Sequence, residues 1–72
     1  MKFIAINPNI LGGTPVVKGT RIPASRIVHL LSQGYSIEQI QEVYPQLNKN
    51  TVIGVIRTIA ESAEHGLFYN NS

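Results

Sequence analysis

The segment from Gly12 to Pro23, with the sequence GGTPVVKGTRIP, restricts the folds open to this chain more than any other part of it. It holds three glycines and two prolines within twelve positions, interleaved with short apolar pieces. Glycine loses the most conformational freedom when it is ordered, and proline fixes φ and removes a backbone donor. In a chain of 72 residues, we therefore expect this segment to form a compact, tightly turned element.

The residues around this segment predict a small antiparallel β unit. Residues 2–6 (KFIAI) are a β-like run, and Asn7-Pro8-Asn9 supplies a turn after it. Further along, the apolar pair Val16-Val17 and the piece Thr20–Ile22 flank Lys18-Gly19, where glycine provides the positive φ of a hairpin-like turn. We expect residues 3–6 to pair with one of these later pieces, and the free edge to be available to a second subunit.

A first helix is predicted directly after Pro23. Ser25 is the expected N-cap, and apolar residues follow at helical spacing. Gly34 is a suitable residue for the position just after a helix, so this helix is expected to end near Gln33.

Two more helices follow, each with its own capping signal. Ser36 and Gln39 form a capping-box pattern at the start of the second helix, which Pro45 ends. Asn48 is the expected cap of a third helix over residues 49–65. The predicted buried stripe of this third helix consists of Val52, Val55, Ile56, Ile59, Ala60 and Ala63.

These elements predict a mainly α fold, in which a three-helix helix-turn-helix bundle follows a small antiparallel β unit. We expect a single domain over residues 1–72. Short strands and turns occupy residues 1–23, the three helices residues 24–66, and a tail residues 67–72.

Composition limits the possible functions. The chain has no cysteine, no aspartate, four glutamates and two histidines, and its net charge is +2. Such a small inventory of reactive groups argues against an enzyme, and no His and Glu have metal-ligand spacing, so we expect no catalytic residues, metal or cofactor. No membrane-spanning run or secretory signal is present, which predicts a cytoplasmic protein. Because a chain this small has a thin core, we also expect a homodimer.

The segment from Gly34 to Ile56 follows the general helix-turn-helix pattern of bacterial regulators. A Gly-Tyr-Ser start precedes the short helix, and a Thr-Val pair lies in the third helix. In this arrangement one helix braces the next, whose N-terminal side chains face the DNA major groove. The predicted DNA contacts are Lys49, Asn50, Thr51 and Arg57.

A protein-protein interaction module without DNA binding is the alternative. Ile53 and Gly54 occupy positions where a groove-reading helix usually carries polar groups. Ile53, together with Leu67, Phe68 and Tyr69, would then form a partner-binding surface. A plain three-helix core with an ordinary solvated face is the third interpretation of the same pattern.

Lys18 and Arg21 are cations on the expected turn. One interpretation is a phosphate-binding or partner-binding pair. The other is a structural role, in which Arg21 caps helix carbonyls or pairs with Glu38 or Glu42 and Lys18 is solvated. The order Lys-Gly-Thr and the presence of Pro15 argue against a phosphate-binding P-loop.

The chain resembles the family called domain of unknown function 433. The resemblance rests on Asn7-Pro8, on the string from Gly12 to Pro23, on Gly34-Tyr35-Ser36 with Glu38 and Ile40, and on Tyr44-Pro45-x-Leu47. It covers about residues 4–63. It implies a homeodomain-like helix-turn-helix fold. It also implies a small dimeric VapB-type antitoxin that neutralises a PIN-like toxin ribonuclease and represses its own promoter, with double-stranded DNA and the toxin as partners.

Overall fold

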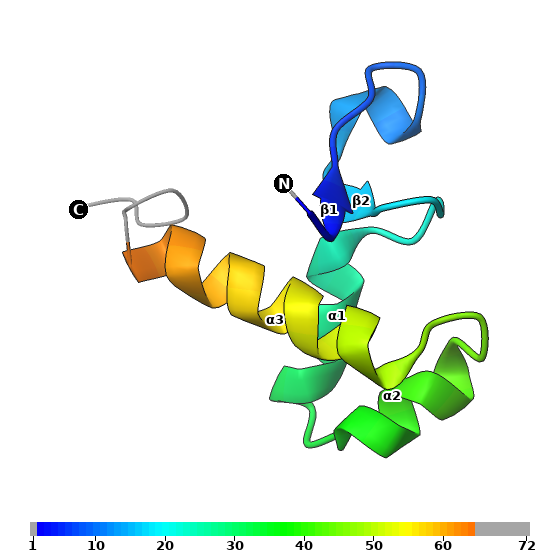
Figure 1. Ribbon diagram of the computed structural model, residues 1–72, viewed down its shortest axis with the longest axis vertical. Helices are drawn as coiled ribbons and strands as arrows, with labels where there is room; N and C mark the ends of the chain where they lie inside the picture. The colour runs from blue at the N-terminus through cyan, green and yellow to red at the C-terminus, as the bar shows by residue number, and fades with distance from the viewer. Residues whose placement is uncertain (1, 65–72) are drawn as a thin grey trace.

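The structure is a computed structural model that describes residues 2–64, with side chains up to residue 62. It is mainly helical, with a small two-stranded antiparallel sheet before three helices, as predicted (Figure 1). The elements are strand β1 (Ile4–Ala5), the 3-10 helix η1 (Leu11–Gly13), strand β2 (Val16–Val17) and the helices α1 (Ala24–Ser32), α2 (Ile37–Val43) and α3 (Lys49–Glu64).

The predicted β unit is confirmed. β1 pairs antiparallel with β2, with Ile4 opposite Val17 and Ala5 opposite Val16. On the other side of β2, Val16 forms a bridge to Pro23, and the backbone N–H of Val17 donates to the carbonyl of Ile22 at 2.8 Å. The turn between these pieces contains Gly19 at φ 81°, a conformation that glycine adopts without steric cost.

Local signals set the end of α1, the start of α2 and the start of α3. The side chains and backbone of Ser36 and Gln39 form the predicted reciprocal capping box, with bonds of 2.8 and 3.1 Å. The Asn48 side chain accepts a hydrogen bond of 2.8 Å from the backbone N–H of Thr51, which confirms it as the cap of α3. Gly34, at φ 91°, follows α1 as predicted.

The predicted cap of α1 is wrong by two positions. Pro23, not Ser25, is the N-cap, and the helix already includes Ser25 in its first turn. The backbone N–H of Ala24 donates to the carbonyl of Pro15 at 2.9 Å, while the Pro23 carbonyl accepts from the N–H of Arg26 at 3.0 Å. The start of α1 is therefore fixed by the β unit before it, and Ser25 is exposed and caps nothing.

One core joins the β unit to the helices. All three helices contact one another, and α1 also contacts β2. The core consists of the buried residues Ile4, Val17, Ile22, Ala24, Ile27, Ile40, Leu47, Val52 and Val55. Of the stripe predicted for α3, Ile56 and Ile59 are partly buried against this core, whereas Ala60 is exposed, contrary to expectation.

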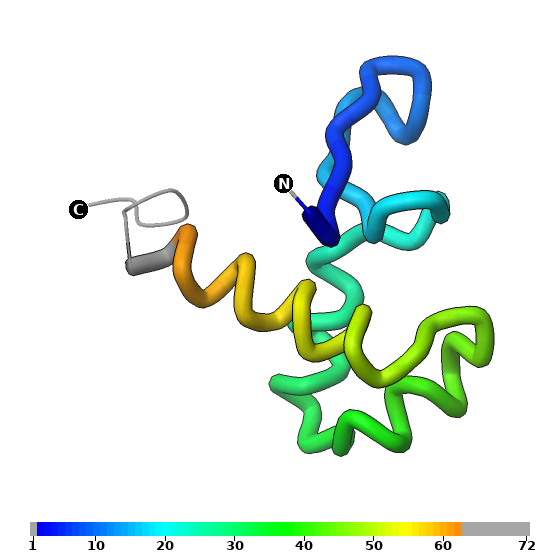
Figure 2. Tube along the Cα trace, in the orientation of Figure 1, coloured from blue at the N-terminus to red at the C-terminus, as the bar shows by residue number. Residues whose placement is uncertain are grey.

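The two ends of the long axis carry different elements. Figures 1 and 2 show α2 at one end and the loop from β1 to η1 at the other, with α3 crossing in front of α1 between them. The chain from Ile6 to Gly13 projects beyond the helical body (Figure 2).

Candidate nucleic-acid interface

The first turn of α3 offers free backbone donors beside polar side chains. The N–H of Thr51 donates to the side-chain oxygen of Asn48, and the N–H of Val52 donates to the backbone carbonyl of Asn48 at 3.1 Å. The backbone N–H groups of Lys49 and Asn50 have no acceptor within residues 2–64. Together with the exposed side chains of Lys49 and Asn50, this turn has the chemistry of an anion-binding helix N-terminus.

Lys49 is only loosely held by a neighbour on α2. Its Nζ lies 3.9 Å from a carboxylate oxygen of Glu38, and the two side chains are 60% and 70% exposed. An exposed ion pair at this distance contributes little to stability. Lys49 can therefore leave Glu38 for another anion at low cost.

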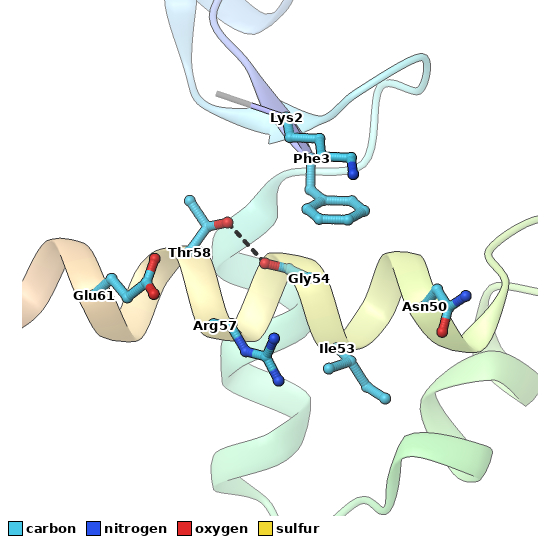
Figure 3. A pocket seen from close by; sticks show the side chains of 8 residues that line it. All are labelled: Lys2, Phe3, Asn50, Ile53, Gly54, Arg57, Thr58 and Glu61. Carbon is cyan, nitrogen blue, oxygen red and sulfur yellow. Dashed lines mark hydrogen bonds between the residues drawn. The ribbon is translucent and has the colours of Figure 1, made fainter.

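One face of α3 lines an open groove of about 710 Å³. Asn50, Ile53, Arg57 and Glu61 recur at helical spacing along this face, and Figure 3 shows their side chains on the same side of the helix. Arg57 is exposed and Ile53 is half-buried. The structure thus brings the predicted DNA contacts Asn50 and Arg57 into one groove with the predicted partner contact Ile53.

The far wall of the groove comes from the N-terminus of the chain. Lys2 and Phe3 line it, with the Lys2 ammonium 5.5 Å from the centre of the Phe3 ring. The ring lies directly over Gly54, as Figure 3 shows. A Cβ added to Gly54 would collide with the ring carbons of Phe3. We therefore name the eight residues that line this space the α3 groove: Lys2, Phe3, Asn50, Ile53, Gly54, Arg57, Thr58 and Glu61.

Sequence reasoning missed the contribution of Lys2 and Phe3 to this site. The sequence feature that could have indicated this contact is Gly54. A glycine inside a helix costs about 1 kcal/mol relative to alanine, which is consistent with another side chain packing against the backbone at that position. The Thr58 hydroxyl donates to the Gly54 carbonyl at 2.7 Å, which ties the next turn to the same position.

The remaining predicted site residues lie elsewhere. Thr51 is half-buried, and it contacts its cap through the backbone. Lys18 and Arg21 are exposed on the turn after β2 and do not line the α3 groove. Within residues 2–64, Arg21 forms no ion pair with Glu38 or Glu42 and no hydrogen bond through its side chain, so the structural interpretation of Arg21 finds no support there. Leu67, Phe68 and Tyr69 lie outside the described residues.

The turn that carries Lys18 and Arg21 is held by other groups. The Thr20 hydroxyl donates to the Val17 carbonyl at 2.8 Å and accepts from the N–H of Ile22 at 3.0 Å. The backbone N–H of Lys18 donates to the carbonyl of Phe3 at 2.8 Å. These bonds assign the turn a role in positioning β1 and Phe3, independent of its two cations.

The described part of the chain contains neither a metal cluster nor a membrane-spanning helix. Residues 2–64 contain no cluster of three or more His, Cys, Asp or Glu side chains that could hold a metal ion. None of the helices described there has the length and apolar character to cross a bilayer.

Comparison with known families identifies the chain. Residues 4–57 of its 72 match the family described as "Protein of unknown function (DUF433)". The chain belongs to the DUF433 family. The match begins at β1 and ends at Arg57, so it includes the β unit, the helix-turn-helix and half of the residues of the α3 groove. Lys2, Phe3, Thr58 and Glu61 lie outside it.

Two related proteins extend the comparison. The uncharacterized protein y4eO of Sinorhizobium fredii is 37% identical over 51 residues, which is 71% of this chain and 23% of that protein. The crystal structure of a DUF433 member from Anabaena variabilis superposes with a TM-score of 0.76 at 25% identity, over 88% of this chain and 62% of the other. This chain therefore spans about a quarter of y4eO and less than two thirds of the Anabaena protein.

Proposed function

We propose that this DUF433 chain is a non-catalytic helix-turn-helix protein that binds its own promoter DNA as the antitoxin of a type II toxin-antitoxin pair. The observation that carries DNA binding is the first turn of α3, where the free N–H groups of Lys49 and Asn50 and their exposed side chains face outward. These are the groups with which a recognition helix contacts phosphates and base edges.

The spacing of the cations supports this assignment. Arg57 lies eight residues after Lys49 on α3, which corresponds to about 12 Å along a helix. The B-DNA major groove is about 12 Å wide. A helix whose axis lies across the groove thus places Lys49 and Arg57 near opposite backbones. Phe3 covers α3 at Gly54, so the contact is assigned to the first turn and Arg57 rather than to the whole length of the helix.

The toxin-neutralising part of the proposal rests on the resemblance to family members described as VapB-type antitoxins. A PIN-like toxin ribonuclease is the proposed partner. The second candidate function is a protein-interaction module that does not contact DNA. The half-buried Ile53 in the α3 groove, next to the Phe3 ring, favours this candidate because it gives a protein side chain an apolar place to bind.

Titration of the protein with its own upstream DNA at two salt concentrations tests DNA binding. We expect affinity to fall steeply with salt, because each neutralised phosphate releases counterions. Arg57→Ala should weaken binding and reduce the slope of log K against log salt by about 1. Arg26→Ala is the matched control, since Arg26 is an exposed arginine on α1 that does not line the groove.

Three outcomes decide between the candidates. Absence of binding at low salt, or equal effects of Arg57→Ala and Arg26→Ala, contradicts the DNA interface. The protein from the adjacent gene should copurify with the wild type if a protein partner binds in the groove. Ile53→Asp should then abolish copurification, whereas Val43→Asp, at an exposed site on α2, should retain it. If the partner copurifies with both variants, Ile53 is not part of the partner-binding surface.

A further inference from the structure

The Phe3 ring covers α3 between the two parts of the helix that are assigned to DNA. Asn50 belongs to the first turn and Arg57 lies two turns further along, so Gly54, with the ring over it, falls between them. A DNA backbone that reaches both residues therefore passes over the ring. A phenyl ring has no hydrogen-bond donor for a phosphate, so the phosphate contact at this point has to come from another side chain.

Lys2 lies on this ring. Its Nζ is 5.5 Å from the centre of the ring, which is within the distance of about 6 Å at which a cation and an aromatic face attract each other. Lys2 is exposed, whereas Phe3 is half-buried. Figure 3 shows the Lys2 side chain extending along α3, with its ammonium between Asn50 and Arg57 in the direction of the helix axis. The cover over α3 thus carries a positive charge on its solvent side.

The ring that supports Lys2 has a fixed position. The carbonyl of Phe3 accepts a hydrogen bond of 2.8 Å from the N–H of Lys18. The next residue, Ile4, is buried and pairs with Val17 in the sheet. Lys2 is therefore separated from an ordered strand by one residue, and the ring restricts its ammonium further. A cation that is already held near its binding position loses less conformational entropy when it binds.

The charges along the α3 groove suit a polyanion. Among the described side chains there is one ion pair, between Lys49 and Glu38. Lys2 therefore has no ion pair within that part of the chain, even with Glu61, the acidic residue of the groove. Glu61 lies about one turn beyond Arg57. From the first turn of α3 to Arg57, the groove thus contains two cations and no carboxylate, which favours an anionic ligand.

We propose that Lys2 contacts a DNA phosphate, as a third cation of the interface beside Lys49 and Arg57. This inference rests on the proposed function, since it needs DNA on the outward face of α3. A contact to phosphate carries no sequence information, so Lys2 contributes to affinity for any duplex. Lys2 lies before residues 4–57, the part that matches the family, and the structure alone brings it into the α3 groove.

A salt series with two duplexes of equal length, the chain's own upstream DNA and an unrelated sequence, tests the role of Lys2. Lys2→Met removes the charge and keeps an apolar stem on the ring. It should weaken binding to both duplexes by the same factor and reduce the slope of log K against log salt by about 1. The ratio of wild-type to variant affinity should therefore fall about fourfold when the salt concentration is raised fourfold.

Two further variants serve as controls. Lys2→Arg keeps the positive charge, so it should bind both duplexes as the wild type does. Arg26→Ala removes one positive charge from an exposed site on α1 that does not line the groove, and it should keep the wild-type slope. Thermal unfolding of Lys2→Met should match that of the wild type, which separates a loss of contact from a loss of fold.

The failure of this inference is distinguishable from the failure of the proposed function. If Arg57→Ala reduces the salt slope while Lys2→Met binds as the wild type does, the DNA interface stands and the role of Lys2 is overturned. Unequal weakening of the two duplexes by Lys2→Met also overturns it, because a phosphate contact is independent of sequence. If the wild type binds neither duplex at low salt, both proposals fail. Loss of a copurifying protein in Lys2→Met would then assign Lys2 to a protein contact instead.

Discussion

At the scale of single residues, Gly54 decides how the β unit meets α3. Its lack of a side chain lets the Phe3 ring lie on the backbone of α3, and any larger residue would collide with that ring. A glycine inside a helix costs about 1 kcal/mol relative to alanine. The burial of an aromatic ring against the helix offsets this cost, so the two residues are expected to act as a pair.

Gly54→Ala should lower the free energy of unfolding by about 1–3 kcal/mol, because the added methyl group forces the Phe3 ring from its place. In a Phe3→Ala background the sign should reverse. There the same change should stabilise the protein by about 0.5–1 kcal/mol, since only helix propensity remains. Urea denaturation of the four proteins in this double-mutant cycle gives both numbers. The same destabilisation in both backgrounds would contradict the pairing of Phe3 with Gly54.

The Phe3–Gly54 contact could not be predicted from the sequence. The two residues are 51 positions apart, and nothing in the local pattern of either one points to the other. In the sequence, Ile53 and Gly54 stand where a DNA-reading helix usually carries polar groups. Gly54 instead receives a side chain from the N-terminus. Leu11 presents the same difficulty, because a positive φ at leucine has no compositional signal.

At the scale of elements, some helix boundaries are fixed by residues close in the sequence and others by residues farther away. The caps at Ser36 and Asn48 were predictable, since each bond joins residues three positions apart. The turn at Gly19 followed from an equally local cue. The sequence predicted that residues 3–6 pair with one of the later pieces but not which one, because the pairing of Ile4 with Val17 joins residues 13 positions apart. The start of α1 was not predictable in this way, because the N–H of Ala24 bonds to the carbonyl of Pro15, nine residues earlier. The candidate DNA contacts on α3 follow from the helix-turn-helix pattern and stay a prediction.

Asn48 is the element-scale test, since it fixes the start of α3 and hence the position of Lys49 and Asn50. Asn48→Ala removes the acceptor of the Thr51 N–H and should lower the free energy of unfolding by about 0.5–2 kcal/mol. Asn48→Asp keeps the cap and adds a favourable charge at a helix N-terminus, so stability should stay within about 0.5 kcal/mol. Thermal unfolding and DNA titration, measured on both variants, separate the two effects.

The aspartate variant distinguishes a structural cap from a DNA contact surface. Under the proposed function, Asn48→Asp should bind DNA clearly more weakly at unchanged stability, because its carboxylate repels the phosphate that approaches the first turn of α3. Equal DNA affinity of Asn48→Asp and wild type at low salt would place the DNA away from this turn.

At the scale of the whole molecule, the β unit and the helices share one core. Ile4 and Val17 from the strands belong to the same buried cluster as Ile27, Val52 and Val55 from α1 and α3. A chain of 72 residues is expected to have a total stability of roughly 4–11 kcal/mol. The free energy lost with a single strand contact is therefore a large fraction of the total stability, and its loss should destabilise the strands and the helices together.

The last prediction compares two isoleucines two positions apart. Ile4 is 5% exposed and Ile6 is 59% exposed. Ile4→Ala should lower the free energy of unfolding by about 2–5 kcal/mol, since it leaves a cavity where strand and helices meet. Ile6→Ala should stay within about 0.5 kcal/mol, because the Ile6 side chain is already largely exposed to solvent. Far-UV circular dichroism in urea reports the helices, so a lower midpoint in Ile4→Ala shows that the strand stabilises them. A helical midpoint unchanged by Ile4→Ala would mean that the β unit unfolds on its own.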